Sequence, residues 1–313
     1  MYHIIVNPNA RSGLGKNKWK LFKQELDRAG ITYIVYFTKS AADTTSYTRS
    51  ITDSCLYKHN ATCNRIIVLG GDGTLNCVIN GIDDLEHTVV TYLPAGTSND
   101  FARALHIPGS LSDTIRAISV QGKTHTADLG VAHFGQKSRR FAVSSGIGYD
   151  ADICREALHA PAKDLLNHLG LGKLTYVAIA LKQLISLKSV SCDLYLDDKP
   201  PIHIKHFYFA AFMQQPFEGG GFAFCPRAND KDGLLDICLI GNISKLYALS
   251  LFPLAAKGLH IGRRGVHYYR ARSIRIVTSK PLCVHTDGEI CGDYKELTLT
   301  TCNRQLQYRN TEK

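Results

Sequence analysis

The residues with the most specific chemical potential form one short run, IVLGGDGTLN, at positions 67–76. In this run an apolar, strand-like segment ends in glycines, one aspartate and one threonine, namely Gly70, Gly71, Asp72, Gly73 and Thr74. Glycine and aspartate are common in turns because they tolerate positive φ angles and form local hydrogen bonds, so a turn explains one or two of the glycines. Glycines on both sides of a single carboxylate predict more: a bulky anion that approaches the backbone, with a cation beside it.

Two further loops of similar composition follow apolar, strand-like runs. The loop after Val6 reads NPNARSG, and the loop after Leu93 reads PAGTSND. In open α/β sheets the loops at the carboxyl ends of the strands converge on the ligand. We expect backbone amides and side-chain groups of these three loops to bind the phosphates of a nucleotide; the candidates are Asn7, Ser12, Gly13, Gly70, Gly71, Gly73, Thr74, Gly96, Thr97 and Asn99.

The segments around these loops alternate between strand-like and helix-like patterns. Trp19, Phe22 and Leu26 recur at helical intervals, and Gly30 is expected to end their helix. Alternating units of this length favour a parallel sheet with helices on both faces. The expected strands cover residues 3–6, 31–37, 65–70 and 88–93, and the expected helices lie within 16–30, 41–58, from about 75, and within 94–105.

The pattern changes after about residue 123. Strand-like runs then dominate, and helical stretches interrupt them only near residues 151–187 and 243–258. This part is expected to be β-rich and mostly antiparallel. The chain has 313 residues, more than the ~250 to 300 that one core usually serves, so two domains are expected.

The charge balance favours anionic partners. The 37 Lys and Arg residues exceed the 27 Asp and Glu residues, which gives a formal net charge of +10. The basic residues are scattered and no RNP-like aromatic motif occurs, so we expect no nucleic-acid partner.

Cysteine usage and the start of the chain favour a reducing compartment. The ten cysteines form no C-x-x-C pair, which favours buried free thiols over a zinc site or disulfides. The start, MYHIIVNPNA, has no positively charged n-region, and no stretch approaches the ~20 apolar residues of a membrane span. We therefore expect a cytoplasmic protein.

Four motifs follow one another along the chain: GGDGTLN at 70–76, PAGTSNDFAR at 94–103, DGLLD at 232–236 and TDGE at 286–289. In this order they resemble the diacylglycerol kinase catalytic family. NAD kinases share the first motif, whereas the second points to lipid kinases. The resemblance implies an α/β ATP-binding domain followed by a β-sandwich that receives the lipid. Because the last strands of such proteins usually return to the first domain, the implied division is residues 1–123 plus 295–313, and residues 124–294.

The resemblance also implies individual roles. Asp72 would orient Mg²⁺ at the ATP phosphates, Asp100 would join it through water, and Glu289 would be the general base. A second, structural Mg²⁺ site would belong to three residues of the β-rich domain, namely Asn229, Asp232 and Leu234. The first loop departs from the family, which often places glycine soon after Asn-Pro.

Simpler roles exist for several of these residues. Asp100 can cap the helix that follows it, and Asp232 can lie in a turn. Asp287 and Gly288 are typical of a type I′ hairpin turn.

Together these patterns predict a Mg²⁺-dependent lipid kinase that transfers the γ-phosphate of ATP to diacylglycerol or a related lipid alcohol, an activity of phospholipid biosynthesis. An NAD kinase is one alternative, which the TSND segment disfavours. A catalytically weak, lipid-binding regulatory protein is another, which intact Asp72, Asp100 and Glu289 disfavour. Two apolar stretches with basic ends, residues 171–188 and 245–264, suit peripheral contact with an anionic membrane, and a homodimer is also open.

Overall fold

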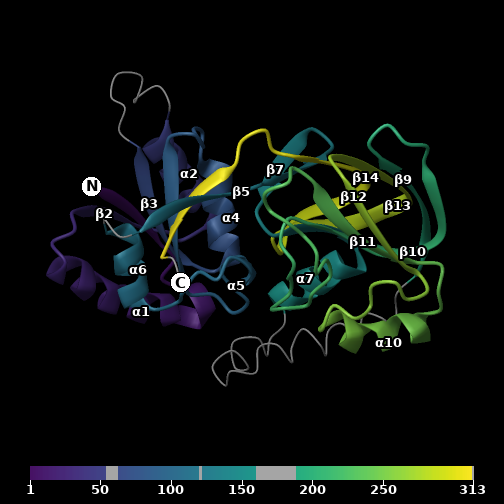
Figure 1. Ribbon diagram of the computed structural model, residues 1–313, viewed down its shortest axis with the longest axis horizontal. Coiled ribbons are helices and arrows are strands. Elements are labelled where there is room, and N and C mark those ends of the chain that lie inside the picture. The colour runs from purple at the N-terminus through teal and green to yellow at the C-terminus, as the bar shows by residue number, and fades with distance from the viewer. Residues whose placement is uncertain (54–62, 120–121, 160–187, 312–313) are drawn as a thin grey trace. The chain divides into compact units, whose positions relative to one another are not determined.

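The computed structural model describes residues 1–53, 63–119, 122–159 and 188–311. The chain divides into two compact units, Met1–Ala127 with Asn303–Lys313, and Asp128–Cys302 (Figure 1). These boundaries differ from those expected at residues 123 and 295. The first shifts because strand β5 (Lys123–Ala127) pairs with the last strand of the chain, and the second because β14 (Glu289–Thr301) pairs along its length with β13 (Ser273–Thr286).

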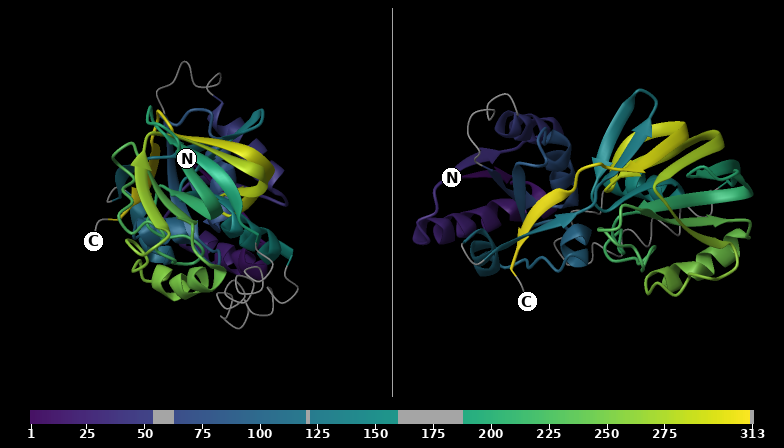
Figure 2. Two further views of the ribbon diagram at one scale, coloured as in Figure 1. Left: turned by 90° about the vertical axis from the view of Figure 1, so that its right-hand side faces the viewer. Right: turned by 45° about the horizontal axis from the view of Figure 1, so that its top comes forward.

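The first unit is built on a mainly parallel sheet. Its strands follow the order β2-β1-β3-β4-β15-β5, and only the edge pair of β15 and β5 is antiparallel. The last strand of the chain, β15, lies between β4 and β5, so the C-terminal segment is part of the sheet of the first unit (Figure 2). The other strands are β1 (Tyr2–Val6), β2 (Tyr33–Phe37), β3 (Asn64–Gly70), β4 (Thr88–Pro94) and β15 (Leu306–Asn310).

Helices cover both faces of this sheet, as the alternating pattern predicts. One face packs Ile4 and Val6 against Trp19, Phe22 and Leu26 in a common core. Gly30 ends that first helix at φ 64°, as expected. The helices are α1 (Ala10–Arg28), α2 (Ala41–Thr52), α4 (Asp72–Gly81), α5 (Asp100–Ala104) and α6 (Leu111–Ile118).

The second unit is β-rich, and every strand pair in its described residues is antiparallel. The long strands β10 (Ile202–Met213) and β13 each pair with three others. Their first halves pair with β9 and their second halves with β8, and in addition β10 pairs with β11 and β13 with β14. The remaining elements are β6 (Gly130–Phe134), β7 (Lys137–Phe141), β8 (Ser144–Gly148), β9 (Val190–Leu196), β11 (Leu235–Gly241), β12 (Val266–Ala271), α7 (Tyr149–His159) and α10 (Lys245–Ala255).

Two cores lie on opposite faces of the central strands of this unit. In β11, Ile237 and Leu239 join one core, whereas Cys238 and Ile240 join the other. Alternate side chains point to opposite faces of a strand, so β11 is covered on both sides. Helices α7 and α10 contribute to the second core. None of the helices within the described residues combines the length and the apolar character that crossing a bilayer requires.

A contact between two glycine backbones brings the second and third loops together. The N–H of Ala95 donates to the carbonyl of Gly70 at 2.7 Å. A Cβ atom added to Gly96 would lie 2.6 Å from the Cα of Gly71 and 2.9 Å from Asn99 Oδ1. No side chain fits between the loops at this point, so glycine is required for the contact and not only for a turn.

Gly96→Ala is expected to lower the free energy of unfolding by about 1–3 kcal/mol, the usual cost of an added methyl group without space. Thermal melting measures this loss. The matched control is Gly109→Ala in the same unit, where the nearest atom to the new Cβ is Pro94 Cγ at 3.8 Å. Equal melting temperatures for the two variants would contradict the close contact between the loops.

Candidate active site

The first loop contains a left-handed turn that the sequence pattern did not predict. Arg11, Ser12 and Gly13 have φ values of 47°, 56° and 95°, so the regular part of α1 begins only after Gly13. Non-glycine residues in this region carry strain of order 1–3 kcal/mol. The two strained residues lie in the stretch where the resembling family often has glycine.

Asn7 and Thr74 join the first loop to the second. Asn7 Nδ2 donates to Thr74 Oγ1 at 3.0 Å, while Asn7 Oδ1 accepts the N–H of Asn9 at 3.0 Å. Thr74 also packs over Gly70, where an added Cβ would lie 2.5 Å from the threonine side chain. The structure thus brings Asn7, Gly70 and Thr74 together at the carboxyl edge of β1 and β3.

Asp72 joins the second loop to the third. Its carboxylate oxygens accept the backbone N–H groups of Asp100 at 3.1 Å and Phe101 at 3.3 Å. Asp72 therefore caps α5 from another loop, and the expectation that the Asp100 side chain caps this helix is wrong. Asp100 itself is buried and pairs with Arg103 at 3.5 Å.

Asn99 shapes the third loop from within. It has a left-handed φ of 50°, its Oδ1 accepts the N–H of Gly96 at 2.9 Å, and its Nδ2 donates to the Gly96 carbonyl at 3.0 Å. Tyr92 donates its hydroxyl to the same Oδ1 at 3.3 Å. The Asn99 side chain thus closes the turn that also contains Thr97. The sequence did not predict these contacts.

Lys18 is a cation at this edge of the sheet that the sequence pattern missed. Its Nζ donates to the carbonyls of Pro94 at 2.6 Å and Gly109 at 3.0 Å, and burial lowers the pKa of its ammonium group. In the sequence it belongs to a lysine-rich run, KNKWK, that is typical of a solvated helix face. Only the fold reveals that one lysine of the run reaches the third loop.

The three loops fit a nucleotide phosphate with its metal ion. Glycine at positions 71, 73 and 96 lets an anion reach the backbone, and the N-terminus of α4 directs its first amides and the positive end of its dipole to the same edge. Carboxylate oxygens are the ligands that Mg²⁺ prefers. The Asp72 carboxylate also accepts the two backbone N–H groups at the start of α5, which fixes its orientation at this edge.

Glu289 lies in the second unit, at the start of β14. Asp287 and Gly288 have φ values of 47° and 80°, and Thr286 pairs with Glu289 across them, which confirms the predicted two-residue hairpin. The turn is fixed by Asp287, because its carboxylate accepts the N–H groups of residues 142, 143 and 144 at 2.9–3.0 Å. Glu289 is half-buried at the end of this anchored hairpin.

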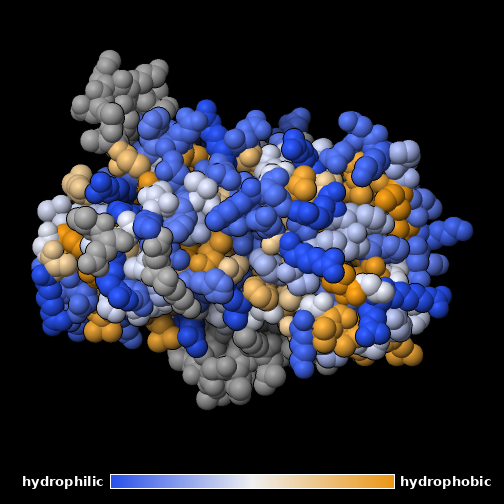
Figure 3. Space-filling model, in the orientation of Figure 1, coloured by the Kyte–Doolittle hydropathy of each residue, from blue (hydrophilic) through white to orange (hydrophobic). Residues whose placement is uncertain are grey.

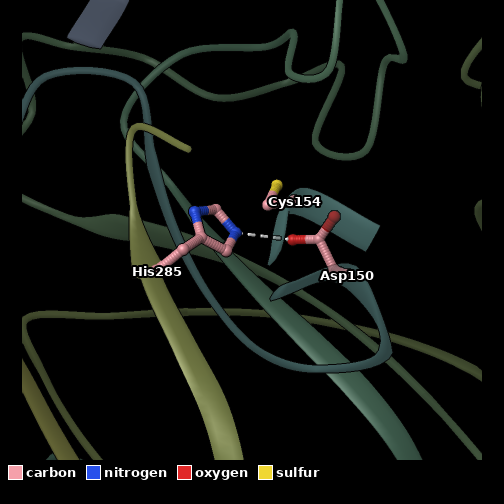
Figure 4. A group of neighbouring side chains, drawn as sticks. All are labelled: Asp150, Cys154 and His285. Atoms are coloured by element: carbon pink, nitrogen blue, oxygen red, sulfur yellow. Dashed lines mark hydrogen bonds and ion pairs between the residues drawn. The ribbon is translucent and has the colours of Figure 1, made fainter. Parts of the chain in front are cut away.

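A buried polar cluster lies beside the hairpin (Figure 4). His285 is fully buried, and its Nε2 lies 2.8 Å from Asp150 Oδ2 and 3.3 Å from Glu218 Oε1. Ser144 Oγ donates to Glu218 Oε1 at 2.6 Å. Gly146 leaves room for the ring, since an added Cβ would lie 2.3 Å from Nε2. These partners are far apart in sequence, and no sequence signal joins them.

Two influences oppose each other on the His285 ring. Burial lowers the pKa of the imidazole, but the carboxylates of Asp150 and Glu218 outweigh burial and raise it to about 9. The N–H of Gly288 points at Nδ1 from 3.2 Å and resists a second ring proton. The two carboxylate charges act on the ring more strongly than one backbone dipole, so the pKa of His285 is raised. In this geometry Nε2–H donates to Asp150.

Asp150, Cys154 and His285 have ligand atoms within 4.8 Å of one another, but they do not form a metal site as arranged. Metals bind the thiolate, and burial raises the pKa of the Cys154 thiol well above its usual value. The Nε2 atom that faces Asp150 carries a proton in this geometry. The cluster instead holds the strands behind the hairpin.

The structural Mg²⁺ site implied by the resemblance does not fit the residues present. Asn229, Asp232 and Leu234 lie between β10 and β11. The Leu234 N–H donates to Asp232 Oδ1 at 3.0 Å, and the Arg270 guanidinium pairs with Oδ2. A protein cation therefore already occupies the carboxylate.

Comparison with known proteins agrees with this architecture. Residues 1–132 match the diacylglycerol kinase catalytic domain family, and residues 143–302 match the YegS C-terminal NAD kinase beta sandwich-like domain. A crystal structure from Bacillus anthracis, described as a putative diacylglycerol kinase, has a TM-score of 0.75 and 22% identity over 98% of this chain and 94% of that chain. An NAD kinase from Archaeoglobus fulgidus, solved with ATP, has a TM-score of 0.52 and 12% identity over 100% and 94%. At such identities both show the fold alone.

Sequence relatives are more specific than these structures. The Bacillus subtilis protein named "Putative lipid kinase YtlR" is 30% identical over 296 residues, which cover 93% of this chain and 94% of that protein. A diacylglycerol kinase of Mycobacterium tuberculosis is 30% identical over 72% of this chain and 70% of its own length. The chain therefore belongs to the diacylglycerol kinase family of lipid kinases.

Proposed function

We propose that the protein transfers the γ-phosphate of ATP, with Mg²⁺, to the hydroxyl of diacylglycerol or a related lipid alcohol. The observation that carries this proposal is the junction of three loops in the first unit, where Gly71 and Gly96 touch and Asp72 bridges to α5. Phosphoryl transfer asks a protein mainly for positioning and for compensation of charge. The amides, the helix N-terminus and the carboxylate supply both.

Each of the proposed groups would have its own task in this reaction. The amides of the second and third loops would bind phosphate oxygens, and Asn7 with Thr74 would hold the first loop against them. Asp72 and Asp100 would hold Mg²⁺, which when bound neutralises charge on the transferring phosphate. Glu289 would accept the proton of the lipid hydroxyl, and its anchored hairpin would limit its motion during that step.

The decisive experiment supplies labelled ATP and Mg²⁺ with a panel of lipid alcohols and NAD. Label in a lipid product, and none in NADP, is the expected result. The NAD arm is needed because an NAD kinase shares the fold. Formation of NADP would replace the proposal with that activity, and no transfer to any acceptor would favour a regulatory lipid-binding protein.

We further propose that the segment around α10 contacts an anionic membrane. Leu246 is 81% exposed and Leu259 is 57% exposed, and hydrophobic surface alternates with hydrophilic surface over α10 at the lower right of Figure 3. The chain has no acidic residue between Asp236 and Asp287, while Lys245, Lys257, Arg263 and Arg264 lie within residues 245–264. Apolar anchors among unbalanced cations suit an acidic bilayer surface. The other predicted stretch, residues 171–188, lies outside the described residues except for its last position.

Asp72→Asn tests the metal-binding carboxylate. The amide keeps one acceptor oxygen but loses one bond to α5, so we expect about 1 kcal/mol less stability. Because the charge is also lost, kcat should fall by about 10²-fold or more, beyond what the small stability change explains. The matched control is Asp83→Asn, which removes the same charge from the loop after α4. If Asp72→Asn has a normal turnover per folded molecule, the role of Asp72 is limited to capping α5.

Glu289→Gln tests the general base. We expect kcat to fall roughly 10²- to 10⁴-fold while the KM for ATP and the melting temperature barely change. Turnover at saturating ATP and lipid, nucleotide titration and thermal melting of one preparation measure these quantities. Glu296→Gln on the same strand is the control, because its side chain is 51% exposed and pairs only at the surface with Arg275. Lost stability with a normal rate would make Glu289 structural.

Leu246→Glu tests the membrane surface. Co-sedimentation with phosphatidylglycerol vesicles should decrease severalfold, because an apolar anchor is replaced by a charge that the anionic surface repels. Leu21→Glu in α1 is the control, since Leu21 is also exposed, at 54%, but lies in the other unit. Equal losses for both variants would show that α10 has no special role.

A further inference from the structure

The turn before β11 is closed by contacts within the protein. The Asp128 carboxylate accepts the N–H of Gly233 at 2.8 Å, and Thr301 Oγ1 donates to the Gly233 carbonyl at 3.1 Å. Asp232 binds the N–H of Leu234 two residues later. The turn therefore has its own set of backbone partners, and its shape does not depend on an added ligand.

Arg270 connects this turn to the sheet. It lies on β12 directly opposite Asp236 of β11 in the strand register. Its Nε is 3.5 Å from Asp236 Oδ1, and its Nη2 pairs with Asp232 Oδ2. One guanidinium thus bridges a carboxylate of the turn and a carboxylate of β11.

The positive charge of Arg270 matters because the side chain of Asp236 is buried. This side chain is fully buried, between the Tyr268 hydroxyl and the Arg270 guanidinium. An ionised carboxylate in such a place is costly unless a cation and hydrogen-bond donors accompany it. Arg270 and the Tyr268 hydroxyl are these partners.

A divalent ion would compete with Arg270 for the same oxygen. Mg²⁺ requires close to octahedral geometry with oxygen ligands at about 2.0–2.1 Å, so at Asp232 Oδ2 it would have to share the oxygen with the guanidinium or displace it. With Arg270 in place, the ion would also face an adjacent positive charge. Both effects oppose metal binding by Asn229, Asp232 and Leu234.

We propose that Arg270 takes the place of the structural metal ion, so that the second unit of this protein is stable without a divalent cation at Asp232. The guanidinium supplies the positive charge, and its planar donors reach both carboxylates at once. This inference concerns stability alone and holds whether or not the protein phosphorylates a lipid.

The test compares thermal melting in EDTA and in millimolar Mg²⁺ for the intact chain and for Asp232→Asn. The first unit can bind Mg²⁺ in both proteins, so the expected result is the same Mg²⁺-dependent shift, or none, in both. A stabilisation by Mg²⁺ in the wild type that Asp232→Asn abolishes would overturn the proposal. This comparison of the wild type with and without Mg²⁺ does not require a variant of lower stability.

Arg270→Ala provides the converse test. In EDTA its melting temperature should fall by about 5 °C, because two carboxylates lose their cation. Mg²⁺ should then recover part of that loss, since the vacated carboxylates can hold it. Arg275→Ala is the control: it removes a cation that pairs with Glu296 at the surface, and it should gain no Mg²⁺ dependence. If Arg270→Ala is as stable as the control in EDTA, the guanidinium is not the structural cation and the proposal fails.

Discussion

The close approach of two glycine backbones is the constraint on which the candidate site depends. Strands β3 and β4 are neighbours, so the loops that follow them must leave the sheet side by side. Gly71 and Gly96 allow them to touch, and only then can the Asp72 carboxylate reach the amides of α5. The helix N-terminus, the carboxylate and the small residues become one surface because nothing larger than hydrogen separates the loops at that point.

This arrangement couples the loops as well as placing them. Asn7 bonds to Thr74 across the first and second loops, and Asp72 bonds across the second and third. A group bound to any one loop therefore acts on residues of the others through short contacts.

The sequence predicted the features that arise from local pattern. Strands with apolar runs, the helix with Trp19, Phe22 and Leu26, and the two-residue hairpin at Asp287 follow from periodicity and turn chemistry. The α/β and β-rich architecture and the family are confirmed as well. What could not be predicted depends on distant pairing: His285 with Asp150, and Arg270 with Asp232, are set by strand register. Spacing along the chain contains no information about such partners.

The aspartates of the motifs differ in the groups that accompany their carboxylates. Asp72 accepts backbone amides at the start of α5, and Asp287 accepts those of residues 142–144. A neutral amide stabilises a carboxylate but does not cancel its negative charge. Asp232 is held by a guanidinium, which cancels that charge in place. Under our proposals a divalent ion would bind at Asp72 and not at Asp232, although both residues precede glycine in similar motifs. The kind of group that accompanies each carboxylate thus separates a proposed metal ligand from a carboxylate that already pairs with a protein cation.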